Sequence, residues 1–229
     1  MIRLHMVVEG QTEEEFVNSI LSAHLGQFDI STDARCVETS RSWSRIFRGG
    51  LMDYRRAKKD LVLWMKEDRN ADSHFTTMFD LYALPGDFPE FDIARRLTDP
   101  YRRVEALETA FARDVDHQRF VPYIQLHEFE ALLLSDPSHF ASRFLGRDRE
   151  VQNLINLSAQ LPSPELIDDR PDFAPSKRII SELPDYEGTK SSVGPLIAGK
   201  IGLALIRSKC PHFDAWISKL EQLGKPSRG

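Results

Sequence analysis

The sequence contains little cysteine, which limits the kinds of metal site and cross-link that it can form. Cys36 and Cys210 are the only two cysteines among its 229 residues. Their spacing matches no zinc-ligand pattern, and a disulfide between them cannot be inferred from sequence alone. We therefore expect two reduced thiols and no cysteine-based metal centre.

Long apolar runs are also missing. No run approaches the about 18 apolar residues that a membrane-spanning helix needs. The chain starts with strand-forming residues rather than with a basic region followed by an apolar signal core. These absences favour a cytoplasmic protein that has no membrane partner.

An excess of positive charge is absent as well, because the formal net charge is -5 at pH 7. An acidic chain is not expected to coat nucleic acid non-specifically, although it can still carry a local basic patch. Two catalytic motifs are missing too. The segment around Gly194 and Lys200 does not match the Gly-x-x-x-x-Gly-Lys loop of ATPases, and His127 has no second histidine at the spacing found in zinc proteases.

The periodicity of the apolar residues predicts the fold class. Apolar residues make up 41% of the chain, which is enough for a substantial core. The expected strands cover residues 4–8, 34–38, 75–84 and 120–126, with a polar connection over 40–50. Beyond the helix after Gly10, the expected helices cover residues 51–68, 101–115, 127–134, 150–161, 175–183, 195–210 and 211–223. This pattern predicts an α/β fold, in which helices sandwich a mainly parallel sheet of about four strands.

The same pattern predicts how the chain is divided. Strands and helices alternate over residues 1–136, which we interpret as an α/β domain. No strand signal recurs over residues 137–229, which we interpret as a helical C-terminal extension. That extension forms either a separate domain or a part of the same one.

The stretch from residue 3 to residue 16 carries the clearest chemical signal. An apolar strand ends at Glu9, Gly10 permits a turn, and Thr12 with Glu15 forms a capping box for the next helix. At roughly 100° per residue, Glu13 falls on the inward face of that helix. Carboxylates at the carboxyl end of a parallel strand can hold a hard divalent cation. The alternative is that Glu9 is a solvated loop acid and that residues 13–15 only offset the helix dipole.

Two further acids follow apolar strands. Asp80 lies inside an apolar run, where an aspartate is costly unless it is paired, hydrogen-bonded, bound to metal or capping a local turn. Glu128 lies at the junction between a strand and a helix, whereas Glu130 is roughly 200° away on a helix, so we expect only Glu128 to face the site. His127 is expected to be a core histidine. We predict that Glu9, Asp80 and Glu128 converge at one edge of the sheet.

Basic residues concentrate in one segment of this acidic chain. Between Arg41 and Lys59 there are seven basic residues and one acid. This segment is either a solvated surface or a contact surface for the phosphate backbone of a nucleic acid. The candidate contacts are Arg41, Arg45, Arg55, Arg56 and Lys59, with a second candidate pair, Lys177 and Arg178, at a predicted helix start.

Five motifs in a fixed order carry a family resemblance. They are VEGQTEEEF (residues 8–16), TTMFDLYALP (76–85), YIQLHEFEALL (123–133), APSKRI (174–179) and CPHFDAW (210–216). Together they resemble an uncharacterised bacterial family with a TOPRIM-like fold, domain of unknown function 4276. That fold is related to the nuclease domains of overcoming-lysogenization-defect proteins.

The resemblance implies an activity and a set of site residues. In TOPRIM proteins the glutamate after the first strand is catalytic, which corresponds to Glu9. An Asp-x-Asp follows a later strand, and here Asp80 is present but Tyr82 replaces the second aspartate. The implied metal ligands are Glu9, Glu13, Asp80 and Glu128, with Asp87 as another candidate for the missing one. The implied catalytic residues are Glu9, Asp80 and Glu128.

The implied activity is Mg²⁺- or Mn²⁺-dependent cleavage of phosphodiester bonds in DNA or RNA. The implied partner is a separate ABC-type ATPase encoded in phage-defence or mobile-element regions. The replacement by Tyr82 leaves an alternative open, namely a non-catalytic TOPRIM-fold subunit that binds an ATPase or nucleic-acid ends. Neither interpretation fixes the oligomeric state, and a homo-oligomer is compatible with both.

Overall fold

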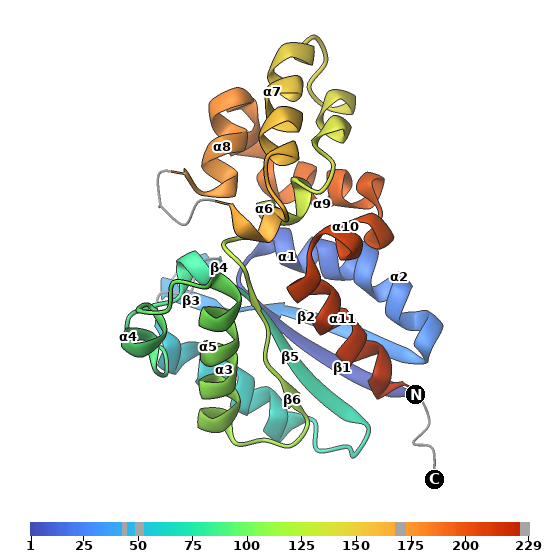
Figure 1. Ribbon diagram of the computed structural model, residues 1–229. Helices are drawn as coiled ribbons and strands as arrows, with labels where there is room; N and C mark the ends of the chain where they lie inside the picture. The colour runs from blue at the N-terminus through green and yellow to red at the C-terminus, as the bar shows by residue number, and fades with distance from the viewer. Residues whose placement is uncertain (43–44, 49–52, 168–172, 225–229) are drawn as a thin grey trace.

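A computed structural model describes residues 1–42, 45–48, 53–167 and 173–224, and the side chains of residues 38–42 and 45–48 lie outside that description (Figure 1). Its centre is a parallel sheet in the order β2-β1-β5-β6, with β7 also paired to β5. The strands are β1 (Ile2–Val8), β2 (Ile30–Cys36), β5 (Ser73–Asp80), β6 (Phe120–Val121) and β7 (Ile124–Gln125). The predicted α/β class is confirmed, with five strands in place of about four.

The two central strands are β1 and β5, and each is buried along most of its length. The last five residues of β1 are all buried, as are five consecutive residues of β5. Burial on both faces explains why these strands have continuous apolar sequences rather than alternating ones. β5 ends at Asp80, four residues before the predicted end, because Leu81–Ala83 form a 3₁₀ turn.

The predicted strand over residues 120–126 is divided into β6 and β7. Pro122 separates them, and proline has no N–H to donate to the ladder. The hydroxyl of Thr77 replaces the missing ladder contacts. It donates to the Tyr123 carbonyl at 3.0 Å and accepts from the Tyr123 N–H at 3.1 Å. Both short strands therefore stay on the same side of β5.

Helices cover both faces of the sheet (Figure 1). One face packs against α3 (Tyr54–Glu67), α4 (Phe91–Ala94) and α5 (Pro100–Val115). The other face packs against α1 (Gln11–Phe16), the π-helical turn Val17–Leu21, α2 (Ser22–Leu25) and α11 (Pro211–Leu223). The observed starts and ends of α5 and α11 lie within one residue of the predicted ones. Both helices have a regular apolar stripe and begin at a proline, which suits the first helical position.

The remaining helices form an upper group above the carboxyl ends of the strands (Figure 1). They are α6 (Glu130–Leu133), α7 (Asp148–Ala159), α8 (Pro175–Glu182), α9 (Lys190–Ile201) and α10 (Leu203–Lys209). One buried cluster runs from Leu4 and Met6 of β1 to Leu154, Ile179 and Ile197 of this group. The upper helices and the sheet therefore share a core.

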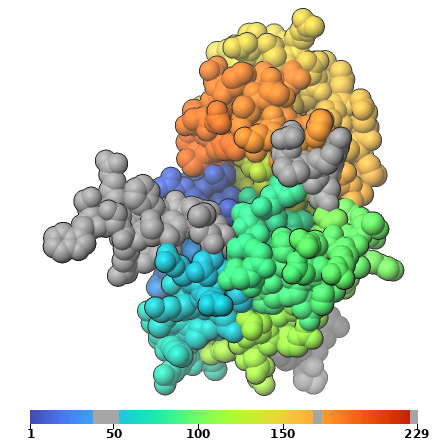
Figure 2. Space-filling view, turned by 90° about the vertical axis from the view of Figure 1, so that its left-hand side faces the viewer, coloured from blue at the N-terminus to red at the C-terminus, as the bar shows by residue number. Residues whose placement is uncertain are grey.

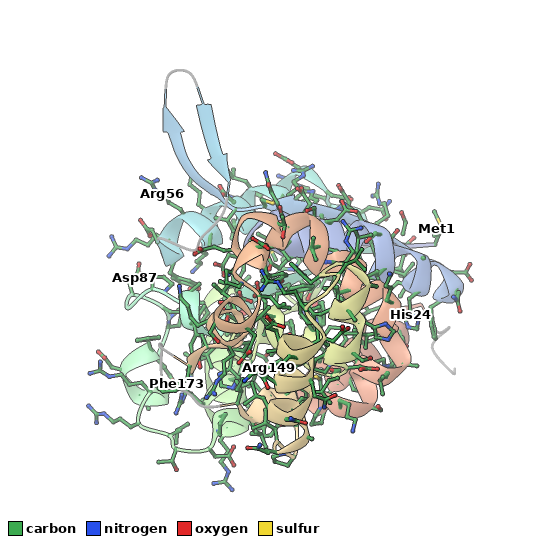
Figure 3. All side chains as sticks on the ribbon, turned by 90° about the horizontal axis from the view of Figure 1, so that it is seen from above. Met1, His24, Arg56, Asp87, Arg149 and Phe173 are labelled. Carbon is green, nitrogen blue, oxygen red and sulfur yellow. The ribbon has the colours of Figure 1, made fainter. Side chains whose placement is uncertain are left out.

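Other predicted elements also differ from the structure, and β2 starts at Ile30 rather than at residue 34. The helix expected over residues 195–210 is two helices, because α9 starts at Lys190 and Gly202, with φ 83°, separates α9 from α10. The expected polar connection contains a hairpin of β3 (Glu38–Ser42) and β4 (Arg45–Arg48), which projects from the body in Figure 3. The sequence did not predict this hairpin, because its strands are mostly polar and basic and have no alternating apolar pattern.

Within the described ranges, no helix is both long enough and apolar enough to cross a bilayer.

A buried ion pair ties α11 to α5 and predicts how stability depends on pH. His212 Nε2 lies 3.0 Å from Glu108 Oε1 and 3.2 Å from the Ile124 carbonyl oxygen. Burial lowers the pKa of His212, but hydrogen bonding to Glu108 and its negative charge outweigh burial, and the net pKa is raised. A raised pKa in the folded state stabilises the protein fully below the unfolded pKa of about 6.5, and the effect is lost as pH rises through the folded pKa.

We predict that His212→Gln lowers the free energy of unfolding more at pH 6 than at pH 9. Urea unfolding at both pH values measures the difference. His139→Gln is the matched control, because His139 is only half-buried and lies 3.6 Å from Asp136. An equal loss at both pH values for His212→Gln would show that His212 contributes packing rather than charge.

Candidate carboxylate site

The ends of β1 and β5 bring two acids side by side. Asp80 is the last residue of β5, and Glu9 follows the last residue of β1. The Glu9 N–H donates to the Met78 carbonyl at 3.2 Å, which continues the pairing of the two strands. The Asp80 N–H donates to Glu9 Oε2 at 3.1 Å. The structure therefore places Glu9 and Asp80 together at the carboxyl edge of the sheet.

Glu13 reaches the same edge from the first turn of α1. Its Oε2 accepts a hydrogen bond from the Gly10 N–H at 2.9 Å, so the side chain turns back toward the strand end. Only 6% of Glu13 is exposed, whereas Glu15 is exposed, as the helical phase predicted. The capping residues differ from the prediction because α1 starts at Gln11, so Gly10 is the N-cap and Glu13 takes the third helical position.

Glu128 and Glu130 both approach this edge, which corrects the prediction that only Glu128 would. His127 has a left-handed backbone with φ 65°, and α6 begins only at Glu130, so helical phase does not relate the two glutamates. Glu128 accepts a hydrogen bond from the Ser176 N–H of α8. Glu130 is 5% exposed, accepts from the Tyr186 hydroxyl at 3.3 Å, and lies 3.6 Å from Lys190 Nζ.

Electrostatic repulsion shows that these acids share one environment. Burial, followed by Glu9, Glu13, Glu128 and Glu130, raises the pKa of Asp80 well above its usual value. Burial and the charge of Glu9 raise the pKa of Glu13 to about 7. Burial and the charge of Glu128 raise the pKa of Glu130 to about 7, although Lys190 offsets part of that rise. We call these five residues, Glu9, Glu13, Asp80, Glu128 and Glu130, the carboxylate cluster.

One oxygen of the cluster is left without a partner. Asp80 Oδ1 is buried and forms no hydrogen bond. A buried acceptor without a donor is costly, and oxygens of this kind are the ligands that hard cations prefer. In their present positions, however, no three His, Cys, Asp or Glu side chains of the described residues are spaced to hold one metal ion. The donor chemistry fits a divalent cation, whereas the side-chain positions would have to adjust to bind one.

A family model described as Domain of unknown function (DUF4276) matches residues 8–221. The chain belongs to the DUF4276 family. The matched range contains all five residues of the carboxylate cluster. No curated protein and no solved structure matches the chain significantly.

Sequence reasoning about this DUF4276 protein missed Glu130. Glu130 lies between Phe129 and Ala131, which are both fully buried. A glutamate within such an apolar segment is costly unless it has a partner, and the same argument had identified Asp80. Asp87, a candidate for the missing ligand, accepts from the Tyr54 N–H at 3.3 Å, at the start of α3. It is not among the leading causes of the raised pKa of Asp80.

The predicted basic residues lie on the β3–β4 hairpin, on α3 and at the start of α8. Arg55, Arg56 and Lys59 lie on α3, and all three are exposed. The side chains of Arg41 and Arg45, on the β3–β4 hairpin, lie outside the described part of the chain. In the view from above, Arg56, Asp87 and Phe173 appear on the same side of the molecule (Figure 3).

The start of α8 carries the second candidate pair of phosphate contacts, and there the Ser176 N–H donates to Glu128. Lys177 is exposed, and the Arg178 guanidinium lies 4.8 Å from the centre of the Phe173 ring. Figure 2 shows the face where α8, in orange, meets the lower layer, in cyan and green. Blue atoms of the N-terminal segment are visible between them. Through the hydrogen bond from the Ser176 N–H, the start of α8 helps to hold Glu128 in the cluster.

The repulsion within the cluster predicts that it reduces stability when no cation is present. We predict that Asp80→Asn raises the free energy of unfolding by about 1 kcal/mol at pH 8 in EDTA. Because the pKa of Asp80 is raised on folding, the cost of its charge is absent below the unfolded pKa of about 4 and grows as pH rises above it. The gain from Asp80→Asn should therefore disappear near pH 4.

Thermal unfolding across this pH range measures the effect, with Asp87→Asn as the matched control. A destabilising Asp80→Asn at pH 8 would mean that the carboxylate of Asp80 makes net favourable contacts.

Proposed function

We propose that this DUF4276 protein is a metal-dependent phosphodiesterase that cleaves nucleic acid. The observation that carries the proposal is the buried, unpartnered Oδ1 of Asp80, surrounded by four further acids. A folded protein retains such repulsion only when something offsets it, and a bound divalent cation would do so directly. Mg²⁺ and Mn²⁺ are the candidates, because both prefer carboxylate oxygens.

We propose a role for each residue of the carboxylate cluster. Glu9, Glu13, Asp80 and Glu128 would hold the cation, which when bound polarises a phosphate oxygen and lowers the pKa of a water molecule. Glu9 is the proposed general base, since its Oε2 is oriented by the Asp80 N–H at the strand end. Glu130 and its neighbour Lys190 border this set. Lys190 supplies positive charge beside the acids, which would favour a polyanionic substrate.

The TOPRIM resemblance supports the same assignment. In TOPRIM proteins the catalytic glutamate follows the first strand, and Glu9 directly follows β1. The second aspartate of the TOPRIM pattern is Tyr82 here. We propose that Glu13, one turn into α1, takes the role of that missing carboxylate. Its charge and that of Glu9 both raise the pKa of Asp80.

A second candidate function is a non-catalytic subunit with the same fold. It is favoured by Tyr82 and by the finding that, over the described ranges, no three potential ligands are already spaced for a metal. On either interpretation we propose an ABC-type ATPase as the partner and phage defence or a mobile element as the setting, from the family resemblance. The two interpretations differ in whether the carboxylate cluster binds metal.

Metal binding can be tested with two glutamates of the same helix. We predict that Glu13→Gln weakens Mn²⁺ binding at least about tenfold, because Glu13 points into the cluster. Glu15→Gln is the matched control, because Glu15 is exposed two residues away. Titration calorimetry with each purified variant gives the affinities. Equal affinities would mean that the acids at residues 13–15 only stabilise the start of the helix. If the unmodified protein bound no Mn²⁺, the non-catalytic subunit would be favoured.

Cleavage is tested with labelled single-stranded and double-stranded DNA and RNA in Mn²⁺. Asp80→Asn should abolish the activity while the protein stays folded, and EDTA should abolish it in the unmodified protein. An Asp80→Asn variant with full activity would exclude the carboxylate cluster as the active site.

The basic face of α3 supplies a separate prediction. If Arg55, Arg56 and Lys59 contact phosphates, replacing all three with alanine should weaken binding to every sequence about equally. The slope of log affinity against log salt should flatten by roughly 0.7 to 0.9 per lost contact. Fluorescence anisotropy at several salt concentrations, in the Asp80→Asn background, measures the slope.

The matched control replaces three exposed basic residues elsewhere, Arg149, Lys200 and Lys219. Because both triple variants lose the same charge, net charge alone would flatten both slopes equally. That outcome would remove the contact role of the α3 residues.

A further inference from the structure

Tyr82, which replaces the second aspartate of the TOPRIM pattern, is held in place by a buried histidine. Tyr82 lies in the 3₁₀ turn that follows Asp80, and its N–H donates to the His127 carbonyl at 3.1 Å. Its hydroxyl lies 2.9 Å from His127 Nδ1, and the two ring centres are 5.2 Å apart. The side chain of Tyr82 is therefore anchored at both its backbone and its hydroxyl.

The direction of this hydrogen bond follows from the other nitrogen of His127. His127 Nε2 lies 3.1 Å from the carbonyl oxygen of Glu165, which can only accept a hydrogen bond. Nε2 must then carry the hydrogen. In a neutral ring, which full burial favours, Nδ1 accepts from the Tyr82 hydroxyl. The proton of Tyr82 is thereby directed at His127, and the plane of its ring is fixed.

Tyr82 forms one wall of a cavity of about 200 Å³ between its 3₁₀ turn, α4 and α5. The lining residues are Leu81, Tyr82, Leu84, Phe91, Arg95, Arg103 and Leu107. We call this cavity the Tyr82 pocket. Three buried leucines and two aromatic rings make most of its wall apolar.

Two arginines complete the wall in different ways. Arg103 donates from Nε and Nη2 to the Leu97 carbonyl, at 3.1 and 2.8 Å, which orients its guanidinium plane. Arg95 has a 63% exposed side chain and an ion pair of 3.2 Å with Asp92. An ion pair this exposed contributes little to stability, so the Arg95 guanidinium can leave Asp92 and stack on a base at low cost.

We propose that the Tyr82 pocket binds an unpaired nucleobase beside the carboxylate cluster, so that the substrate is a single strand or a frayed strand end. This inference rests on the proposed function and names its substrate class. Aromatic faces and guanidinium planes are the surfaces on which unpaired bases stack. Tyr82 lies two positions after Asp80, a reach of at most about 7 Å, and its N–H donates to the carbonyl of His127, the neighbour of Glu128, so the pocket adjoins the cluster.

The composition of the pocket distinguishes it from a phosphate or metal site. Its lining contains no acid, and the guanidinium of Arg103 is already engaged with a carbonyl oxygen. A base within a duplex would have to leave its stack to enter such a pocket, at a cost that a single strand avoids. The pocket therefore favours unpaired over paired substrate.

The test compares two fluorescein-labelled strands in EDTA, with Asp80→Asn as the reference protein. One is a 12-residue deoxyadenosine strand, and the other is an abasic strand of the same length and phosphate count. Because phosphate contacts are equal, the affinity ratio isolates the bases. We expect the deoxyadenosine strand to bind at least tenfold more tightly.

Three variants locate the effect. Tyr82→Ala removes the stacking wall and should bring the ratio close to one. Tyr82→Phe keeps the ring but loses the bond to His127, so it should give an intermediate ratio. Arg95→Gln changes an exposed residue that folding does not require, and it should lower the ratio two- to fivefold. Leu63→Ala is the matched control, because Leu63 is a 44% exposed leucine on α3 and should leave the ratio unchanged.

The outcomes separate this inference from the proposed function. Equal binding of both strands by a protein that binds Mn²⁺ and cleaves DNA or RNA overturns the pocket and leaves the phosphodiesterase in place. A ratio unaffected by Tyr82→Ala and Arg95→Gln also overturns the pocket. Failure to bind either strand, without Mn²⁺ binding, overturns both proposals together.

Discussion

The repulsion among buried carboxylates at the ends of β1 and β5 is the constraint on which the site depends. Asp80 and Glu9 are fixed there by strand pairing, because β1 and β5 are neighbours and the Asp80 N–H donates to Glu9. A parallel sheet brings every strand end to one edge, so acids that follow apolar strands must meet. The sheet thus creates the repulsion, and the upper helices determine how much of it is relieved.

Helix α9 packs close to the carboxylate cluster, and this packing relieves part of the repulsion among the acids. A Cβ on Gly194 would lie 3.1 Å from both Phe129 Cε1 and the Tyr186 hydroxyl oxygen, so only glycine allows α9 to pack this closely without a shift. That approach brings Lys190, at the start of α9, to Glu130, and the Tyr186 hydroxyl donates to the same carboxylate. Helix α8 adds the Ser176 N–H to Glu128. The C-terminal helices therefore stabilise acids that the sheet alone would leave in conflict.

Sequence reasoning succeeded where a local period determines structure. The apolar run of β1, the stripe of α5 and the inward phase of Glu13 all follow from the spacing of residues along one element. Sequence reasoning failed where contacts between residues far apart in the sequence determine the structure. Glu130 was missed because the left-handed backbone at His127 delays the start of α6, and no local pattern encodes that turn. Lys190 acts through Glu130 and Gly194 acts in part through Phe129, each about 60 positions or more away, which periodicity cannot reveal.

Under the proposed TOPRIM relationship, Tyr82 stands where that pattern has a second aspartate, and the repulsion within the cluster gives a physical reason for the difference. Five acids already meet at the edge of the sheet, and a sixth carboxylate two residues after Asp80 would raise the cost of ionising the others. A tyrosine adds no charge, and its hydroxyl is satisfied by His127 within the core. In the proposed function, cation binding then falls to Glu13 and Glu128, which arrive from other elements. The neutral aromatic wall beside the charged cluster is what the proposed pocket would use to hold a base, by a different chemistry from that which holds the polyanion.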